Sequence, residues 1–237
     1  MTITSHQNQK LKEIRKLNQR RKARDGAQRF VAEGEDLLQA ADQAGWIPVE
    51  RYCAEGSGLP GTPVSPELLA GASELGSGTR TLAVYDERWL PQPQGPLAVY
   101  LHGVADPGNV GTILRSAEAF QASTVVLGPG TADPYGPKAV RASMGAIFTV
   151  PVARASPDHL PGSTIALDAK SERPLAEIEL DGEITLLIGA ERHGLPEDIL
   201  KRADRTARIP ISSHSLNAAM AATVALYELR RIPRSNS

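Results

Sequence analysis

Near its C-terminus the chain reads Arg208-Ile209-Pro210-Ile211-Ser212-Ser213-His214-Ser215-Leu216-Asn217 and continues into an apolar stretch that ends near Arg231. A short strand is expected to stop at Pro210. A helix is expected to begin close to Ser215 and Asn217, because both side chains can accept hydrogen bonds from the free N–H groups of a first helical turn. A helix that starts directly after a strand often holds a polar ligand. This stretch therefore predicts an α/β fold with a ligand site at the junction.

The rest of the C-terminal part, from Leu97 onward, alternates apolar strands with helices. Near-continuous apolar strands separated by helices are typical of a parallel sheet covered on both faces, which binds ligands at the carboxyl ends of its strands. The expected strands are Leu97–His102, Thr124–Leu127, Ile147–Val150, Thr164–Leu167, Ile184–Ile188 and Ala207–Ile209. The expected helices are Asn109–Phe120, Pro137–Ser143, a short one after Pro196, and Leu216–Arg230.

The N-terminal part begins with a strongly basic stretch. Between Lys10 and Arg29 there are nine basic and two acidic residues, and Leu11, Ile14 and Leu17 lie at helical spacing. This pattern predicts an amphipathic helix, with a basic face that is either an ordinary solvated surface or a phosphate-facing patch of an RNA or DNA binder. Short strands and helices over residues 30–85 predict a small α/β unit. We place a first domain at 1–90, a proline-rich linker at 91–96 and a second domain at 97–237.

Composition narrows the possible classes of protein. The chain has 237 residues, 41% apolar, with a net charge of −1. The single cysteine, Cys53, excludes an internal disulfide and a cysteine-rich zinc site, and the five histidines show no metal-ligand spacing, so no metal is expected. No apolar run is long enough to cross a membrane, which favours a cytoplasmic protein.

Two more strand–loop–helix junctions carry polar residues, in the segments Asp106–Ala117 and Leu186–Pro196. In the first, Asn109 is a plausible helix cap, and Arg115 is placed to project from the helix towards the mouth of the sheet. In the second, Gly189 at a strand end allows close backbone approach to a ligand, and Glu191 follows in the loop. Neither segment has the glycine spacing of a dinucleotide-binding or phosphate-binding loop, which disfavours hydride transfer and nucleotide hydrolysis.

Together the three segments resemble, in order, the three motifs of the SpoU-type (TrmH-like) RNA 2′-O-ribose methyltransferases of the SPOUT superfamily. The resemblance covers roughly residues 97–232, and the N-terminal part is similar to the substrate-binding domain that many of these enzymes carry. The residues that carry the resemblance are Asn109-x-Gly111-x-Ile113-x-Arg115-x-Ala117, Gly189-x-Glu191-x-x-Gly194-Leu195, and Ile209-Pro210 with Ser215-Leu216-Asn217.

The resemblance implies a fold and a set of roles. It implies a deep trefoil knot in the parallel sheet domain, preceded by a small (L30e-like) α/β domain, and a homodimer formed through the last helix with its alanines Ala218, Ala219, Ala221, Ala222 and Ala225. It implies that S-adenosylmethionine is bound by Gly189, Ile209 and Leu216. The catalytic group would comprise Arg115, Asn109, Glu191, Ser215 and Asn217.

The expected reaction is methyl transfer to a ribose 2′-oxygen of RNA. Because a guanidinium stays protonated, we interpret Arg115 as an electrostatic stabiliser or phosphate clamp, with the proton passing to a phosphate or water. Two positions depart from the family pattern: the spacer between Ile211 and Ser215 is short, and Gln121 stands where a glycine is common.

Ribosomal RNA is the expected substrate. The alternatives are a transfer RNA 2′-O-methyltransferase, a non-catalytic RNA-binding protein that kept the fold, and a nucleotide-cofactor enzyme on a doubly wound sheet.

Overall fold

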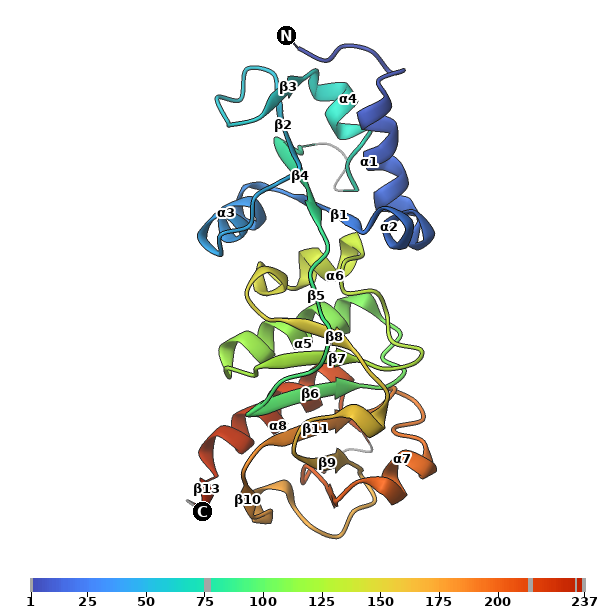
Figure 1. Ribbon diagram of the computed structural model, residues 1–237, viewed down its shortest axis with the longest axis vertical. Helices are drawn as coiled ribbons and strands as arrows, with labels where there is room; N and C mark the ends of the chain where they lie inside the picture. The colour runs from blue at the N-terminus through green and yellow to red at the C-terminus, as the bar shows by residue number, and fades with distance from the viewer. Residues whose placement is uncertain (1, 75–77, 213–214, 233, 236–237) are drawn as a thin grey trace.

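The N-terminal unit is a four-stranded sheet in the order β1-β4-β2-β3 with helices packed beside it (Figure 1). The computed structural model describes residues 2–74, 78–212, 215–232 and 234–235. Strand β4 pairs antiparallel with β1 and β2, and β3 is parallel to β2. The elements are α1 (Gln9–Gln19), α2 (Arg21–Ala27), β1 (Arg29–Glu33), α3 (Glu35–Gln43), β2 (Glu50–Ala54), β3 (Thr62–Val64), α4 (Pro66–Ala70) and β4 (Thr81–Asp86).

The basic stretch forms two helices, whereas its pattern predicts one. Helix α1 buries Leu11, Ile14 and Leu17, and the chain then becomes extended at Arg20, with φ −131° and ψ 114°. No large apolar residue continues the stripe beyond Leu17, so nothing holds a longer helix against the sheet. The second helix, α2, is instead anchored by the buried Arg24.

The C-terminal unit is a seven-stranded sheet in the order β12-β9-β11-β6-β7-β8-β5, with every neighbouring pair parallel. Its strands are β5 (Trp89–Leu90), β6 (Leu97–Leu101), β7 (Thr124–Leu127), β8 (Val152–Arg154), β9 (Ser163–Leu167), β11 (Ile184–Ile188) and β12 (Arg205–Ala207). Its helices are α5 (Pro107–Ala119), α6 (Pro137–Ala142), α7 (Glu197–Arg202) and α8 (Ala218–Arg231), with 3-10 turns at Ala146–Phe148, Pro157–His159 and Leu175–Glu177. Two short strands, β10 (Leu180–Asp181) and β13 (Arg234–Ser235), pair with each other.

The central strand β6 shows why the sheet is covered on both faces, as the sequence predicts. All five of its residues are buried. Because side chains alternate along a strand, Leu97, Val99 and Leu101 join the core beneath α5 and α8, whereas Ala98 and Tyr100 join the core beneath α7.

Two details of this unit differ from the sequence-based expectation. The predicted strand Ile147–Val150 is wrong: Ala146–Phe148 forms a 3-10 turn after Gly145, whose φ is +100°, and the strand begins at Val152. A short apolar run does not distinguish a buried turn from a buried strand. In addition, β5 (Trp89–Leu90), placed by the sequence in the N-terminal domain, forms the edge strand beside β8.

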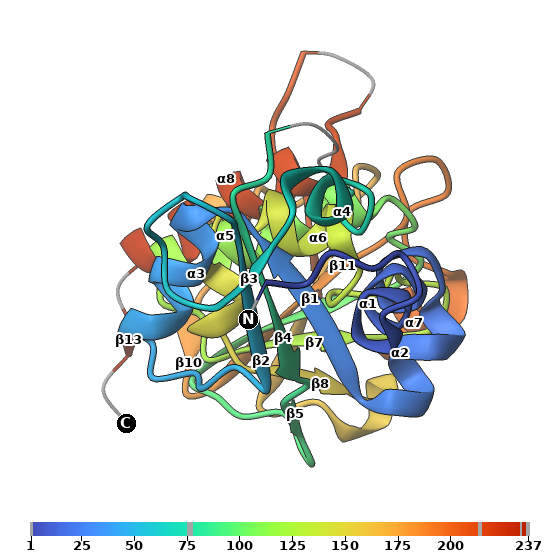
Figure 2. The ribbon, with the colours of Figure 1, turned by 90° about the horizontal axis from the view of Figure 1, so that it is seen from above.

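The two units share one continuous apolar core. Phe30 and Tyr85 of the N-terminal sheet meet Tyr135 and Phe148 of the C-terminal unit, with ring centroids 4.7 Å apart for Phe30–Tyr135 and 5.2 Å apart for Tyr85–Phe148. The Trp46 Nε1–H donates to the Phe148 carbonyl at 2.7 Å. Figure 2, which looks along the long axis, shows the N-terminal unit stacked over the C-terminal one. These contacts fix the orientation of the two units.

The helices in the described part of the chain are all too short or too polar to cross a membrane.

Candidate active site

A cleft of about 600 Å³ opens at the carboxyl ends of β9, β11 and β12. The loops that follow these strands line it, through residues 167–170 and 188–197 and through Ala207, Arg208, Ile209, Ile211, Ser215 and Leu216. Parallel strands end at the same edge of a sheet, which is why loops distant in sequence meet there. The three residues predicted to contact a cofactor, Gly189, Ile209 and Leu216, all lie in the wall of this cleft. Glu191 and Ser215 also line it.

Gly189 shapes one wall of the cleft by allowing the loop after β11 to fold back on itself. A Cβ atom at Gly189 would lie 2.1 Å from the Gly194 carbonyl carbon and 2.2 Å from the Leu195 nitrogen. Ala190 and Gly194 pair across the loop, with N–H···O distances of 3.1 and 2.9 Å. No side chain fits between these backbone segments, so the loop requires glycine at position 189.

A chain of side-chain hydrogen bonds connects the three motif segments. The Asn217 Nδ2 donates to Asn109 Oδ1 at 3.1 Å, and the Asn109 Nδ2 donates to Glu191 Oε1 at 2.6 Å. Asn217 also caps α8, where its Oδ1 accepts from the backbone N–H groups of Ala219 and Met220 at 2.9 and 3.3 Å. Three residues of the predicted catalytic group are therefore held together by direct contacts.

The helix cap of α5 is Asp106, although the sequence suggests Asn109. Asp106 Oδ1 accepts from the Gly108 N–H at 2.6 Å, and Lys138 Nζ lies 3.1 Å from the same oxygen. The hydrogen bond from Lys138, followed by that from Gly108, holds the pKa of the Asp106 carboxyl below its ordinary value. The sequence carried a signal for this cap, since Pro107 directly after an aspartate is typical of a helix start. Asn109 is thereby free to reach Glu191.

Arg115 is exposed on α5, and within the described part of the chain it has no hydrogen-bond or ion-pair partner. It does not line the cleft. Its neighbour Ser116 turns towards α8, where its Oγ lies 2.6 Å from Thr223 Oγ1. The structure therefore leaves the Arg115 guanidinium unpaired and outside the hydrogen-bonded group.

The alanines of helix α8, which were expected to contact a second chain, do not form its exposed surface. The alanines Ala218, Ala219, Ala222 and Ala225 are buried in the core of their own chain, and Ala221 lines the cleft. Packing of α8 against α5 and the sheet therefore uses the small residues within the monomer. The exposed apolar residues of α8 are Met220, Val224 and Tyr227.

The two departures from the family pattern have different outcomes. Gln121 adopts the left-handed conformation, with φ +55°, that a glycine would adopt without strain, and its Oε1 accepts from Arg230 Nη2 at 2.7 Å. In the short spacer between Ile211 and Ser215, Ser213 and His214 lie outside the described residues.

Comparison with known proteins identifies the family of this chain. The SpoU rRNA Methylase family matches residues 96–227, and the MRM3-like substrate binding domain matches residues 8–84. The 23S rRNA (guanosine(2553)-2′-O)-methyltransferase RlmP of Bacillus subtilis is 29% identical over 96% of this chain and 98% of its own length.

Solved structures are similar over nearly the whole chain. An AdoMet-bound rRNA methyltransferase from Sinorhizobium meliloti superposes with a TM-score of 0.84 at 30% identity, covering 98% of this chain and 97% of that one. The SpoU methyltransferase AviRb from Streptomyces viridochromogenes, in complex with AdoMet, gives a TM-score of 0.84 at 27% identity, covering 95% of this chain and 98% of that one. The order of motifs, the fold and both matched regions agree: this chain belongs to the SpoU rRNA methylase family.

Proposed function

We propose that this protein transfers a methyl group from S-adenosylmethionine to a ribose 2′-oxygen of ribosomal RNA. The observation that carries the proposal is the hydrogen-bonded group Glu191–Asn109–Asn217, which joins all three motif segments at the edge of the cleft. Two relatives that match this chain over nearly their full length are named for ribosomal RNA. This favours ribosomal RNA over transfer RNA.

The cleft suits S-adenosylmethionine. Its volume of about 600 Å³ falls within the ~300–1,000 Å³ typical of small-molecule sites. Ile209 and Leu216 supply apolar wall for an adenosine, and the glycine at position 189 keeps the adjacent loop backbone clear of side chains. When bound there, the cofactor supplies an electrophilic methyl group.

The side chains around the cleft must position the ribose and stabilise charge on its oxygen. Arg115 stays protonated at neutral pH, so it acts as a cation that stabilises the developing negative charge or clamps the adjacent phosphate. All five of its N–H donors are available, because it has no partner in the described part of the chain. Asn109, Glu191, Ser215 and Asn217 orient the substrate, and the hydroxyl proton passes to a phosphate oxygen or water.

The proposal also covers the assembly, the chain topology and the location of the protein. Met220, Val224 and Tyr227 recur on one side of α8 at intervals of four and three residues, and we propose that this face packs against a second copy of the chain. The trefoil knot remains a proposal that rests on the family resemblance. We also propose a cytoplasmic location, because the relative named for 23S ribosomal RNA is bacterial.

Calorimetric titration with S-adenosylhomocysteine, the demethylated product, tests the cofactor site directly. We expect one site per chain, weakened by Leu216→Asp because a carboxylate would enter the apolar wall. Arg115→Ala should abolish transfer of a labelled methyl group to ribosomal RNA while sparing this binding, and Arg115→Lys should restore only part of the transfer, since lysine keeps the charge but loses the planar fork. Absence of binding, with and without ribosomal RNA, would instead indicate a non-catalytic RNA-binding protein.

A further inference from the structure

A second groove, of about 330 Å³, lies between helix α2 of the N-terminal unit and the loop after β7. Its charged lining residues are Arg21 and Arg154, and among the described residues that line it none is acidic. Trp89, Ala105, residues 127–132 and Pro134 complete the walls. Because β7 and β8 are parallel to β11, the groove lies at the same edge of the sheet as the cofactor cleft.

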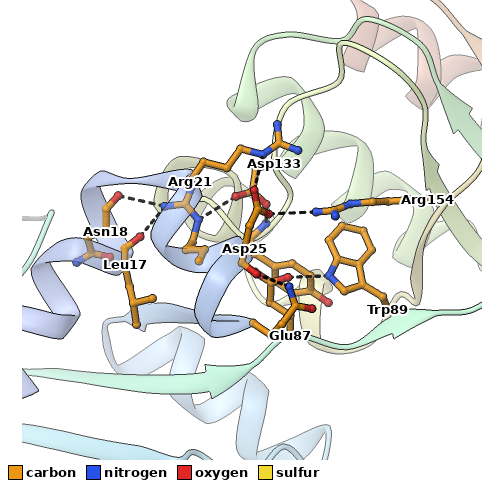
Figure 3. Close-up of polar contacts among 11 residues, drawn as sticks. Leu17, Asn18, Arg21, Asp25, Glu87, Trp89, Asp133 and Arg154 are labelled. Atoms are coloured by element: carbon orange, nitrogen blue, oxygen red, sulfur yellow. Dashed lines mark hydrogen bonds and ion pairs between the residues drawn. The ribbon is translucent and has the colours of Figure 1, made fainter.

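Arg154 is held in the groove by stacking. Its guanidinium carbon lies 4.0 Å from the centre of the Trp89 ring. Trp89 is itself fixed, because its Nε1–H donates to Glu87 Oε2 at 2.7 Å and its ring packs edge-on against Tyr135 at 5.2 Å. The stacked arginine therefore keeps a defined position, with its guanidinium directed towards Asp25 (Figure 3).

Both arginines are only loosely paired. Arg21 Nε and Arg154 Nη2 lie 3.6 and 3.5 Å from the two oxygens of one carboxylate, Asp25. These distances exceed those of a good N–H···O hydrogen bond, and the arginine side chains are 52% and 47% exposed. In contrast, the neighbouring Arg24–Asp133 pair is buried at 2.8 Å and anchors α2 to the C-terminal unit. Thus Arg24 fixes the helix, and Arg21 keeps donors for a ligand.

The groove is adjacent to the cofactor cleft. A Cβ atom at Gly130, in the groove wall, would lie 3.3 Å from the Gly103 Cα, and one at Gly103 would lie 3.3 Å from the Ala190 Cβ. Ala190 belongs to the wall of the cofactor cleft. A polynucleotide seated in the groove would therefore reach the cleft across a single intervening loop.

We propose that a backbone phosphate of the RNA substrate binds between Arg21 and Arg154, in the position that the Asp25 carboxylate partly occupies. The proposal rests on the proposed function and specifies where RNA contacts this chain. Guanidinium groups suit phosphate because their planar N–H donors match its oxygens, and two of them converge on one point here. Asp25 weakens the site, since its negative charge competes for the same donors.

Fluorescence anisotropy with a fluorescein-labelled oligoadenylate of about 20 nucleotides, measured over a series of salt concentrations, tests the proposal. Arg21→Ala and Arg154→Ala should each weaken binding by about three- to tenfold, and each should lower the slope of log K against log salt by about 0.7, the value for one contact to single-stranded RNA. Lys22→Ala is the matched control, because Lys22 is exposed on the same short helix and does not line the groove. It should change the slope much less.

Asp25→Asn provides a test of opposite sign. Removing this charge should tighten binding, by about threefold, which a misfolded variant would not do. Three results would each overturn the proposal. They are unchanged slopes in both arginine variants, a Lys22→Ala effect as large as that of Arg21→Ala, and weaker RNA binding by Asp25→Asn.

Titration of the wild type with S-adenosylhomocysteine separates this proposal from the proposed function. If the wild type binds S-adenosylhomocysteine while the arginine variants bind RNA normally, the groove proposal alone is wrong. If the arginine effects are observed but S-adenosylhomocysteine does not bind, the groove stands as an RNA site and the transferase proposal fails.

Discussion

Gly111→Ala should destabilise the protein, although alanine is the better helix former. Gly111 lies inside α5 and faces α6. An added Cβ atom would lie 2.3 Å from the Ala139 carbonyl oxygen, 2.7 Å from the Ala142 Cβ and 2.9 Å from the Ser143 nitrogen. Two of these three atoms belong to backbone, so no side-chain rotation relieves the overlap and α6 must shift.

The magnitude follows from two opposing effects. Overpacking of a well-packed contact costs typically ~1–3 kcal/mol, and contacts this short to backbone place Gly111→Ala at the upper end. Replacing glycine by alanine within a helix stabilises the helix by about 1 kcal/mol. The net loss in the free energy of unfolding is therefore about 2 kcal/mol, which for a chain of this length lowers the Tm by roughly 4–8 °C.

Thermal unfolding followed by circular dichroism measures this loss, with Gly26→Ala as the control. Gly26 lies in α2, and a Cβ atom added there would have no other atom within 4 Å, so alanine should raise the Tm slightly. Because Gly111 does not line the cofactor cleft, Gly111→Ala should bind S-adenosylhomocysteine with unchanged affinity at a temperature where it is folded. A Tm equal to or above that of the wild type would refute the packing argument.

Three other substitutions test the site and its surroundings. Asn109→Asp places a carboxylate against Glu191 and should lower the Tm at pH 7, with partial recovery at about pH 5 because the pair can then share a proton; a loss that is independent of pH would contradict this. Burial raises the pKa of the Glu87 carboxyl in the folded protein. The free energy of unfolding is therefore unaffected by this shift below the ordinary pKa of a glutamate, and it falls as the pH rises through the native pKa of Glu87. Glu87→Gln should therefore raise the urea midpoint at pH 7 and not at about pH 4, and equal shifts at both would be inconsistent with burial as the cause. Tyr227→Glu should shift the sedimentation of the proposed dimer to that of a monomer, whereas an unchanged sedimentation coefficient would exclude this face as the contact.

The central strands of the fold could be predicted because a strand that is buried on both faces consists almost entirely of apolar residues. In β6 and β11 every residue is buried, and the runs Leu97–Leu101 and Ile184–Ile188 are correspondingly apolar apart from Thr185, whose hydroxyl donates to the Pro161 carbonyl. The placement of α2 after the break at Arg20 was not predictable in the same way. It depends on the tertiary pairing of Arg24 with Asp133, which is 109 positions away.

The location of the candidate site could be predicted from the sequence, but the contacts that each of its residues makes could not. Polar residues after strand ends indicated the location, because the topology of a parallel sheet collects them at one edge. Local spacing suggested that Asn109 caps α5, whereas its contacts are to Glu191 and Asn217, 82 and 108 positions away. Only the folded chain shows such partners. Gly111 likewise lies in a motif that resembles a catalytic one, yet its physical constraint is close packing against α6.

Asn217 determines which atoms donate and which accept in the hydrogen bonds that connect it to Asn109 and Glu191. Asn217 Oδ1 accepts from the first turn of α8, so the amide can present only its Nδ2 to Asn109. Asn109 must then accept through Oδ1 and donate through Nδ2, which leaves Glu191 as an acceptor. This hydrogen bond engages Glu191 Oε1 and holds the carboxylate against Asn109. We therefore propose Glu191 as a positioning residue and the unpaired guanidinium of Arg115 as the group that acts on the substrate.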